Sequence, residues 1–166
     1  MQDHKNFFQK TNIYVLKLES GKYYIGKSDN INFRLEDHFN SNGSEWTKLF
    51  APLSLIELIK NVSPFEEDKI VKVYMAKFGI ENCRGGSYSN IKLEKLQIEF
   101  LEKEIWASTD LCIRCGRSSH FVLDCFANTN INKEKIKETN SSKHKKRKFK
   151  YYDDNEYSTS SSSDSS

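Results

Sequence analysis

The pattern of apolar and polar positions predicts a small β-sheet near the N-terminus. Two apolar runs, at residues 13–18 and 23–25, flank a turn signal at Ser20-Gly21. Short apolar runs separated by such a signal are typical of a β-hairpin. A third run at residues 53–59 is rich in Leu and Ile, which suits another strand. Together the three runs predict a three-stranded antiparallel sheet.

Between and after these predicted strands, the apolar residues have helical spacing. It predicts helices over residues 31–40, 63–78 and 89–107, and a short helix or turn at residues 45–50. Pro64 lies in the first turn of the second of these helices, where proline is favoured. We therefore expect an α+β fold, in which the small sheet is flanked by helices. The last helix either docks on this core or acts as a stiff spacer.

Composition adds little about partners, because the 166 residues carry a net charge of only +3. No apolar segment is long enough to span a bilayer, and the N-terminal residues lack the pattern of a signal peptide. We therefore expect an intracellular protein, cytoplasmic or nuclear, that is neither secreted nor bound to a membrane. Its oligomeric state is left open.

The chain from residue 129 onward is poor in apolar residues and is expected to be disordered. Basic residues dominate at residues 143–150, and a Ser/Asp-rich stretch follows. This run is a candidate for non-specific phosphate binding, for a nuclear-import signal, or for a solubilising segment. The residues that we expect to contact nucleic acid are Lys145, Lys146, Arg147 and Lys148.

Four residues between positions 112 and 125 have the spacing of a zinc site. The motif is Cys112-x2-Cys115-x4-His120-x4-Cys125. Three thiolates and one imidazole complete a tetrahedral shell, so the zinc would be structural. Disulfides are the alternative, but a reducing compartment and the histidine both favour zinc. Cys83, the remaining cysteine, lies far outside the motif.

A second set of polar residues lies within the predicted α+β core. Tyr14 and Tyr24 fall on adjacent strands, so one face of the sheet can present two phenols together. Arg34 and His38 are four residues apart and therefore share one face of a helix. Glu67 lies beside an apolar stripe on the second long helix.

These residues resemble the motifs of the GIY-YIG nuclease superfamily over about residues 12–90. N-I-Y at residues 12–14 is similar to the first tripeptide, with Asn where Gly is commoner, and Y-I-G at residues 24–26 is the second. The resemblance assigns six site residues, Tyr14, Tyr24, Arg34, His38, Glu67 and Asn82. Residues 79–89 also resemble GIY-YIG proteins encoded by large DNA viruses, which would place the protein in a host cell.

The resemblance implies how these residues cleave a phosphodiester. Tyr14 would be the general base, and Glu67, preferred over Glu66, would hold one Mg²⁺ or Mn²⁺ ion. Arg34 would neutralise charge on the phosphate. Tyr24 and His38 would orient the water and the phosphate, and Asn82 would support a loop or a metal-bound water. Lys27, next to the second tripeptide, is a further candidate phosphate contact.

The zinc motif resembles CCHC knuckles of the retroviral nucleocapsid type. Gly116 and Phe121 fit that pattern, whereas Ile113 stands where an aromatic residue is usual and Ser119 where Gly is usual. Knuckles of this type stack nucleobases on aromatic residues, so the departures weaken the expectation of tight base recognition. A protein-binding knuckle is the alternative. The residues left for phosphate contact and stacking are Arg114, Arg117 and Phe121.

The sequence therefore predicts a metal-dependent endonuclease that acts on nucleic acid, DNA rather than RNA, and carries one structural Zn²⁺. The alternative is a non-cleaving zinc-knuckle adaptor whose nuclease-like domain is degenerate. The predicted organisation is a nuclease domain at 12–90, a helix or spacer at 91–108, a knuckle at 109–128 and a disordered tail at 129–166.

Overall fold

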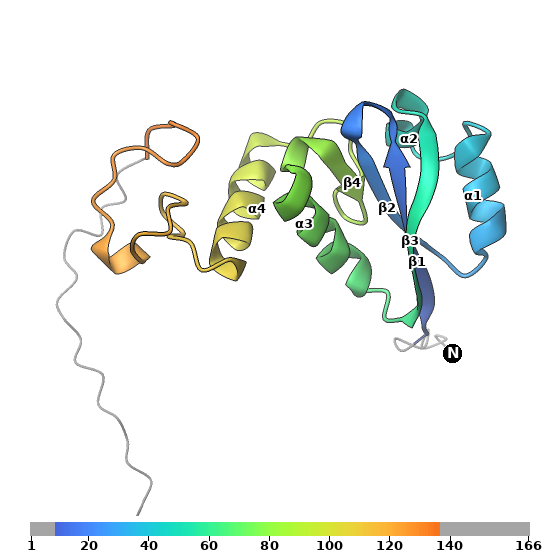
Figure 1. Ribbon diagram of the computed structural model, residues 1–166, viewed down its shortest axis with the longest axis horizontal. Coiled ribbons are helices and arrows are strands. Elements are labelled where there is room, and N and C mark those ends of the chain that lie inside the picture. The colour runs from blue at the N-terminus through green and yellow to red at the C-terminus, as the bar shows by residue number, and fades with distance from the viewer. Residues whose placement is uncertain (1–8, 137–166) are drawn as a thin grey trace, which may run out of the picture. The chain divides into compact units, whose positions relative to one another are not determined.

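The computed structural model describes residues 9–136 of the chain (Figure 1). The helices and strands are β1 Thr11–Leu18, β2 Tyr23–Ser28, α1 Ile31–Phe39, α2 Glu45–Leu49, β3 Pro52–Val62, α3 Glu66–Phe78, β4 Cys83–Gly85 and α4 Lys95–Ser108. Single turns of 3-10 helix occur at Glu19–Gly21, Ile80–Asn82 and Val122–Asp124. The predicted basic run at 143–150 lies outside the described residues. Within these residues, no helix combines the length and apolar character needed to cross a bilayer.

The predicted α+β class is confirmed, but the sheet has four strands and not three. The strand order is β3-β1-β2-β4, with β1 antiparallel to both β2 and β3. The added strand, β4, runs parallel to β2 and pairs only with residues Tyr23 to Ile25. A strand of three residues that includes Arg84 and Gly85 has too little apolar alternation to be recognised from sequence.

The β1–β2 connection is a tight turn at the predicted Ser-Gly signal. Ser20 and Gly21 both have positive φ, 55° and 69°. The Lys22 N–H donates to the Glu19 carbonyl at 3.2 Å. Positive φ at both central residues is the type I′ pattern, whose twist matches that of the flanking strands. The Leu18 N–H donates to the Lys22 carbonyl at 2.8 Å, so these residues close the hairpin, and in this register Tyr14 lies opposite Gly26.

One face of the sheet packs against α1 and α2. Tyr14, Leu16 and Tyr24 point to this side, because alternate residues of a strand face the same way. They form a buried cluster with Trp46 of α2, whose indole N–H donates to the Tyr23 carbonyl at 3.1 Å. Both helices have side-chain caps, and α1 begins after Asn30, whose side chain accepts the Phe33 N–H. This face carries the two tyrosines of the predicted site.

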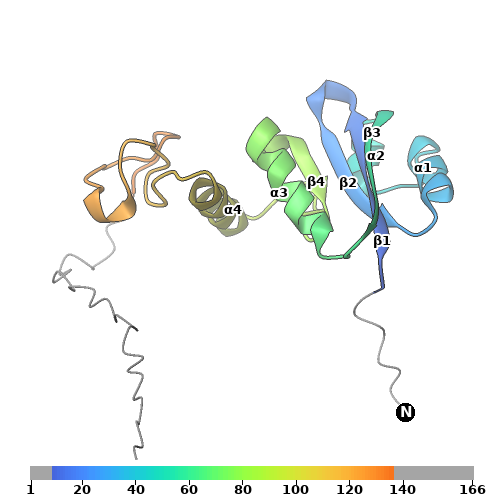
Figure 2. The same ribbon diagram turned by 60° about the horizontal axis from the view of Figure 1, so that its bottom comes forward.

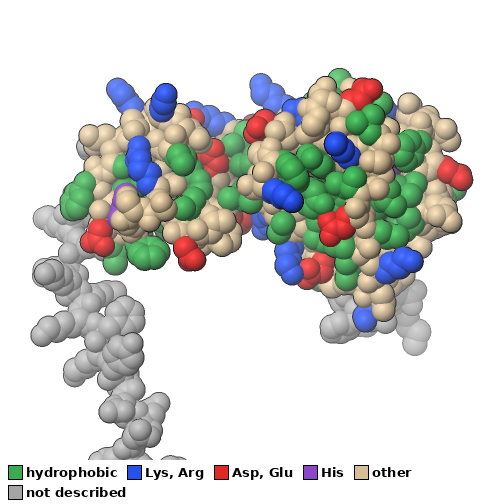
Figure 3. Space-filling model, in the orientation of Figure 1, with side chains coloured by type: hydrophobic (Ala, Val, Ile, Leu, Met, Phe, Trp, Pro, Cys, Tyr) green, Lys and Arg blue, Asp and Glu red, His purple; other side chains and the backbone are tan. Residues whose placement is uncertain are grey.

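The opposite face packs against α3, and α4 packs against α3 in turn (Figure 2). Leu101 of α4 is 1% exposed and joins Val71 and Met75 of α3 in one buried cluster. Of the two roles considered for this helix, the structure therefore shows docking. Partly buried residues such as Ile59 and Tyr74 extend the cluster outward. Figure 3 shows apolar side chains gathered over α3 and β3.

The last long helix begins later than predicted, at Lys95 and not at Ser89. Arg84 is only 5% exposed, and its guanidinium donates to the carbonyls of Asn90 at 2.8 Å and Ile91 at 3.0 Å. Because these carbonyls are bonded to Arg84, the segment is held in an irregular conformation ahead of the helix.

The described residues extend past the predicted boundary at 128, to residue 136. Ile131 donates its N–H to the Cys115 carbonyl at 2.8 Å, and Ile136 donates to the Asn128 carbonyl at 3.0 Å. The prediction of disorder from residue 129 includes residues 129–136, which the structure describes with these hydrogen bonds. Backbone hydrogen bonds to the cysteine loop order this segment, and composition does not reveal them.

The docking of α4 predicts a large effect of Leu101→Ala on stability. Removing a buried leucine from such a cluster should lower the free energy of unfolding by about 2–5 kcal/mol. Leu96 on the same helix is 66% exposed, so Leu96→Ala should change it by about 0.5 kcal/mol or less. Urea unfolding of both variants measures the difference. Equal midpoints for the two variants would contradict the docking.

Candidate functional site

A buried pair, Tyr14 and His38, forms the centre of the predicted site. β1 carries Tyr14, α1 carries His38, and the two residues are 1% and 0% exposed. The Tyr14 Oη and His38 Nε2 atoms are 2.8 Å apart and share a hydrogen bond. The other ring nitrogen, Nδ1, lies 2.9 Å from Thr47 Oγ1 of α2. A chain of hydrogen bonds thus connects the sheet with both helices of this face.

Burial shifts the protonation of these groups. It raises the pKa of Tyr14 and of Tyr24 above the ordinary 10.0, against the opposing charge of Arg34, and Glu67 adds a smaller increase. Burial, and after it the Arg34 charge, lowers the pKa of His38 from 6.5 to about 4. Both phenols and the imidazole are therefore neutral near pH 7.

Tyr24 and Arg34 complete the cluster on this face. The ring of Tyr24 lies 4.9 Å from that of His38 and 6.4 Å from that of Tyr14, between centroids. The side chain of Arg34 is 34% exposed and forms an ion pair with Asp37 at 3.6 Å. Arg34 thus lies at the surface, beside two buried phenols.

The glycine of the second tripeptide allows Tyr14 to reach this position. Gly26 lies opposite Tyr14 in the hairpin. A Cβ at position 26 would collide with the phenolic oxygen of Tyr14 and approach Tyr24 Cε1 at 3.0 Å. Glycine is therefore required here by close approach.

Glu67, in the first turn of α3, is the acid that lies inward. It is 7% exposed, and its Oε2 is 3.1 Å from Lys27 Nζ of β2. Glu66, the neighbour considered as an alternative, instead pairs with Lys69 at the surface. Asp68 holds the adjacent loop, because its carboxylate accepts the Ser87 N–H at 2.8 Å and the Ser87 hydroxyl at 2.6 Å. The first turn of α3 thus positions Glu67, and the bonds from Ser87 to Asp68 hold the adjacent loop.

Asn82, the sixth predicted residue, does not join this group. Its Oδ1 accepts from Lys22 Nζ at 2.7 Å, and its Nδ2 donates to the Phe78 carbonyl at 2.6 Å. Phe78 ends α3, and the eleven residues from Glu67 correspond to a helix length of about 16 Å. The contacts of Asn82 fit the support of a loop at the far end of α3.

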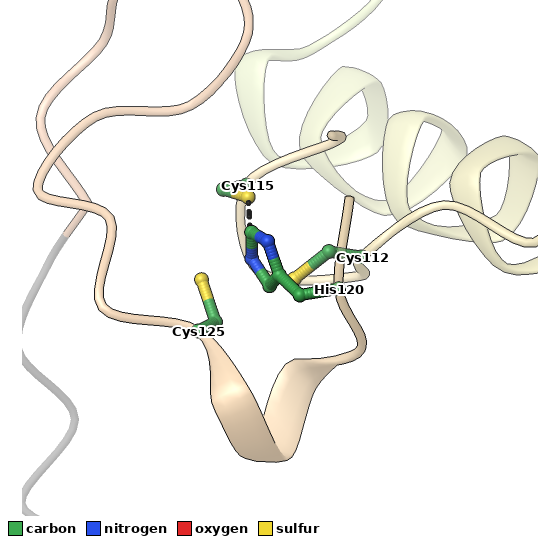
Figure 4. A group of neighbouring side chains, drawn as sticks. All are labelled: Cys112, Cys115, His120 and Cys125. Atoms are coloured by element: carbon green, nitrogen blue, oxygen red, sulfur yellow. Dashed lines mark hydrogen bonds between the residues drawn. The ribbon is translucent and has the colours of Figure 1, made fainter. Parts of the chain in front are cut away.

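The four predicted zinc ligands lie together (Figure 4). One ligand atom from each of Cys112, Cys115, His120 and Cys125 is within 4.8 Å of all the others. Tetrahedral zinc with Zn–S bonds of about 2.3 Å needs sulfur atoms about 3.8 Å apart, so a small contraction fits the ion. No other group of three or more such side chains in residues 9–136 is close enough to share a metal.

The surroundings of the cluster favour a thiolate at Cys125 and fix the histidine. Burial acts to raise the pKa of Cys125, but hydrogen bonds from the Ala127 N–H, Arg114 and His120 lower it. His120 Nδ1 lies 3.0 Å from the Ser119 hydroxyl, which leaves Nε2 to face the sulfur atoms. Ser119, the departure from the usual glycine, therefore orients the imidazole of a candidate metal ligand.

The two arginines predicted to contact phosphate have partners within the chain. Arg114 donates to the carbonyls of Cys125 at 3.0 Å and Ala127 at 2.9 Å. Arg117 donates to the Thr129 carbonyl at 2.8 Å. Phe121 is 66% exposed and has its ring available. The structure thus shows both arginines bracing the zinc segment.

Residues 10–78 match the family model of the GIY-YIG catalytic domain. The match extends from just before β1 to the end of α3 and includes Tyr14, Tyr24, Arg34, His38 and Glu67. It covers less than half of the 166 residues and ends before Asn82 and the zinc segment. No curated protein and no solved structure matches the chain. Residues 10–78 are therefore similar to the GIY-YIG catalytic domain, and the resemblance to viral proteins stays a prediction.

The buried neutral His38 predicts a pH-dependent loss of stability. The unfolded chain takes up the proton near pH 6.5, whereas folded His38 takes it up only near 4. Stability should therefore fall as pH decreases through this window, by on the order of 3 kcal/mol from this group. Chemical unfolding at several pH values measures the change. In His38→Gln the fall over this window should be smaller, and identical pH profiles would exclude the shift.

The cysteine–histidine cluster predicts one zinc ion per chain. Cys115→Ser combined with His120→Ala should abolish zinc binding, because two of four ligands are lost. Cys83→Ala is the matched control, since Cys83 lies in β4 outside the cluster and should leave zinc at one per chain. Metal analysis of reduced protein gives the ratio. Zinc in the double variant equal to that of the control would contradict the site.

Proposed function

We propose that residues 12–90 form a metal-dependent endonuclease site that hydrolyses phosphodiester bonds of nucleic acid, DNA rather than RNA. The observation that carries the proposal is the buried Tyr14–His38 pair beside Arg34, in a segment that matches the GIY-YIG catalytic domain. Glu67, buried beside Lys27, supplies the acid. The exposure, charge and hydrogen bonds of these residues support each step of the proposed reaction.

Two cations receive the phosphate. Arg34 and Lys27 have side chains 34% and 48% exposed, whereas Tyr14 and Glu67 are almost fully buried. An incoming phosphate therefore meets the two cations first, and both can donate hydrogen bonds to its oxygens. Binding draws Arg34 from the phenols and Lys27 from the Glu67 carboxylate, which opens the buried groups to the reacting water.

Tyr14 takes the proton of that water without forming a free phenolate. An ordinary phenol is ionised in only about one molecule in a thousand at pH 7, and burial lowers that fraction further. We propose that Tyr14 passes its own proton to His38 Nε2 as it accepts one from water. The water oxygen then bonds to phosphorus, the bond to the 3′-oxygen breaks, and that oxygen takes up a proton from solvent.

The least favourable step of this proton transfer is the formation of the His38 imidazolium. With a pKa of about 4, protonating His38 at pH 7 is unfavourable by on the order of 4 kcal/mol. The positive charge of Arg34 contributes to that shift. A phosphate bound to Arg34 neutralises this charge, so the substrate itself raises the proton affinity of His38.

Glu67 would hold a divalent cation, Mg²⁺ or Mn²⁺. A single carboxylate suits a hard cation that keeps most of its water ligands, and the ion pair with Lys27 engages only one of its oxygens. When bound, such an ion polarises the phosphate and stabilises the leaving oxygen. Asp68 is no second ligand, because Ser87 occupies both of its oxygens.

A non-cleaving adaptor is the alternative, and the buried histidine argues against it. Burial lowers the pKa of His38 from 6.5 to about 4, so below pH 6.5 the unfolded chain binds a proton that the folded chain does not, which lowers stability. An apolar residue would fill this place in the core without that penalty and without needing hydrogen-bond partners. Retention of the histidine is expected where its ring nitrogen serves the chemistry.

The zinc segment is proposed as a separate module that helps to bind nucleic acid. Exposed Phe121 can stack on a base, and the basic residues Lys145, Lys146, Arg147 and Lys148 can contact phosphates. The guanidinium groups of Arg114 and Arg117 already donate to backbone carbonyls. We therefore expect them to contribute less to nucleic-acid binding. Binding of a protein at this module is the alternative.

Glu67→Gln should reduce Mg²⁺-dependent cleavage by about a hundredfold or more, because a neutral amide is a weak ligand for a hard cation. Glu66→Gln is the matched control: Glu66 lies one residue away, pairs with Lys69, has a side chain 37% exposed, and its change should leave cleavage unchanged. Plasmid, branched DNA and single strands are incubated with each variant, with and without Mg²⁺. Equal activity of the two variants would exclude Glu67, and absence of cleavage by the unmodified chain on every substrate would favour the adaptor.

A further inference from the structure

Thr47 closes the hydrogen-bond chain behind His38. It lies on α2, is 2% exposed, and its Oγ1 is 2.9 Å from His38 Nδ1. No motif of the sequence singles it out. Its position on the far side of the imidazole nevertheless decides which ring nitrogen carries the proton.

The direction of each hydrogen bond follows from the single proton of a hydroxyl. Thr47 Oγ1 donates to the Ser44 carbonyl at 2.9 Å, and a carbonyl can only accept. The Thr47 proton is thus engaged, and its lone pairs face His38 Nδ1. Nδ1 must then be the donor, so the neutral ring carries its proton there, and Nε2 is left to accept from the Tyr14 hydroxyl.

The loop before α2 is shaped to hold this arrangement. Ser44 is the N-cap of α2, and its hydroxyl accepts the Thr47 N–H at 3.3 Å. A Cβ at Gly43 would collide with His38 Nδ1 and lie 2.6 Å from Thr47 Oγ1. The absence of a side chain at position 43 lets the loop approach the ring, and the cap fixes Thr47 against it.

We propose that Thr47 is a positioning residue that holds His38 in the Nδ1–H tautomer, so that Nε2 can receive the proton of Tyr14. This role rests on the proposed function. In the opposite tautomer Nε2–H would donate to Tyr14, and the proton could not pass from the phenol to the ring. Holding one tautomer through a neighbouring acceptor is how buried histidines are commonly oriented.

The test compares Thr47→Val, which removes the hydroxyl at similar volume, with Thr47→Ser, which keeps it. Nitrogen NMR of the histidine side chains reports which ring nitrogen carries the proton, and the His38 signals are assigned by their loss in His38→Gln. The unmodified chain and Thr47→Ser should show Nδ1–H and a bare Nε2. Thr47→Val should show a mixture of both tautomers.

Single-turnover cleavage gives the second measurement. Thr47→Val should lower the rate by about a hundredfold with unchanged affinity for DNA, and Thr47→Ser should restore most of it. An Nε2–H tautomer in the unmodified chain overturns the proposal, and so does a Thr47→Val variant that keeps a pure Nδ1–H tautomer and the full rate. The NMR result is independent of cleavage, so an inactive protein would refute the nuclease function while the tautomer is still decided.

Discussion

The hydrogen bond between Tyr14 and His38 is the interaction on which the site face depends. It links the central strand β1 to α1 between two buried side chains, and Thr47 extends it to α2. Buried polar groups are tolerated only when their hydrogen bonds are satisfied, and none of the buried side-chain polar atoms in residues 9–136 lacks a partner. Removing one member of this chain therefore leaves the next one unsatisfied, so the groups that we propose for the chemistry also fix the packing of the face.

The acidic residue, Glu67, comes from α3, which packs on the opposite face of the sheet. β4 pairs with β2 only as far as Ile25. Beyond that residue, Lys27 of β2 forms its ion pair with Glu67 in the first turn of α3. Apolar packing of Val71 and Met75 fixes α3, and Leu101 of α4 belongs to the same buried cluster. The sheet thus separates a polar, hydrogen-bonded face from an apolar one, and the two sets of functional groups meet near the end of β2. Exposed cations cover buried acceptors there, an arrangement suited to a polyanionic substrate.

Features carried by local patterns could be predicted from the sequence, whereas features that depend on tertiary contacts could not. The hairpin, α1 and α3 follow from turn chemistry and apolar spacing, and the candidate zinc ligands follow from their intervals along the chain. β4 was missed because three residues carry no alternation, and the late start of α4 depends on the buried guanidinium of Arg84. Asn82 was grouped by resemblance, but its bond to Lys22 places it at the other end of α3. Thr47 has no signature, because only the fold brings it to His38.

The most direct measurement of the central claim is the single-turnover cleavage rate of Tyr14→Phe at saturating DNA and Mg²⁺, together with its affinity for DNA. The phenol is buried and does not bind phosphate first, so the affinity should equal that of the unmodified protein. Loss of the proton path should reduce the rate by about 10²- to 10⁴-fold. Thermal unfolding of the same samples verifies that the variant is folded. A folded variant that cleaves at the unmodified rate would contradict the account, because Tyr14 would then take no part in the reaction.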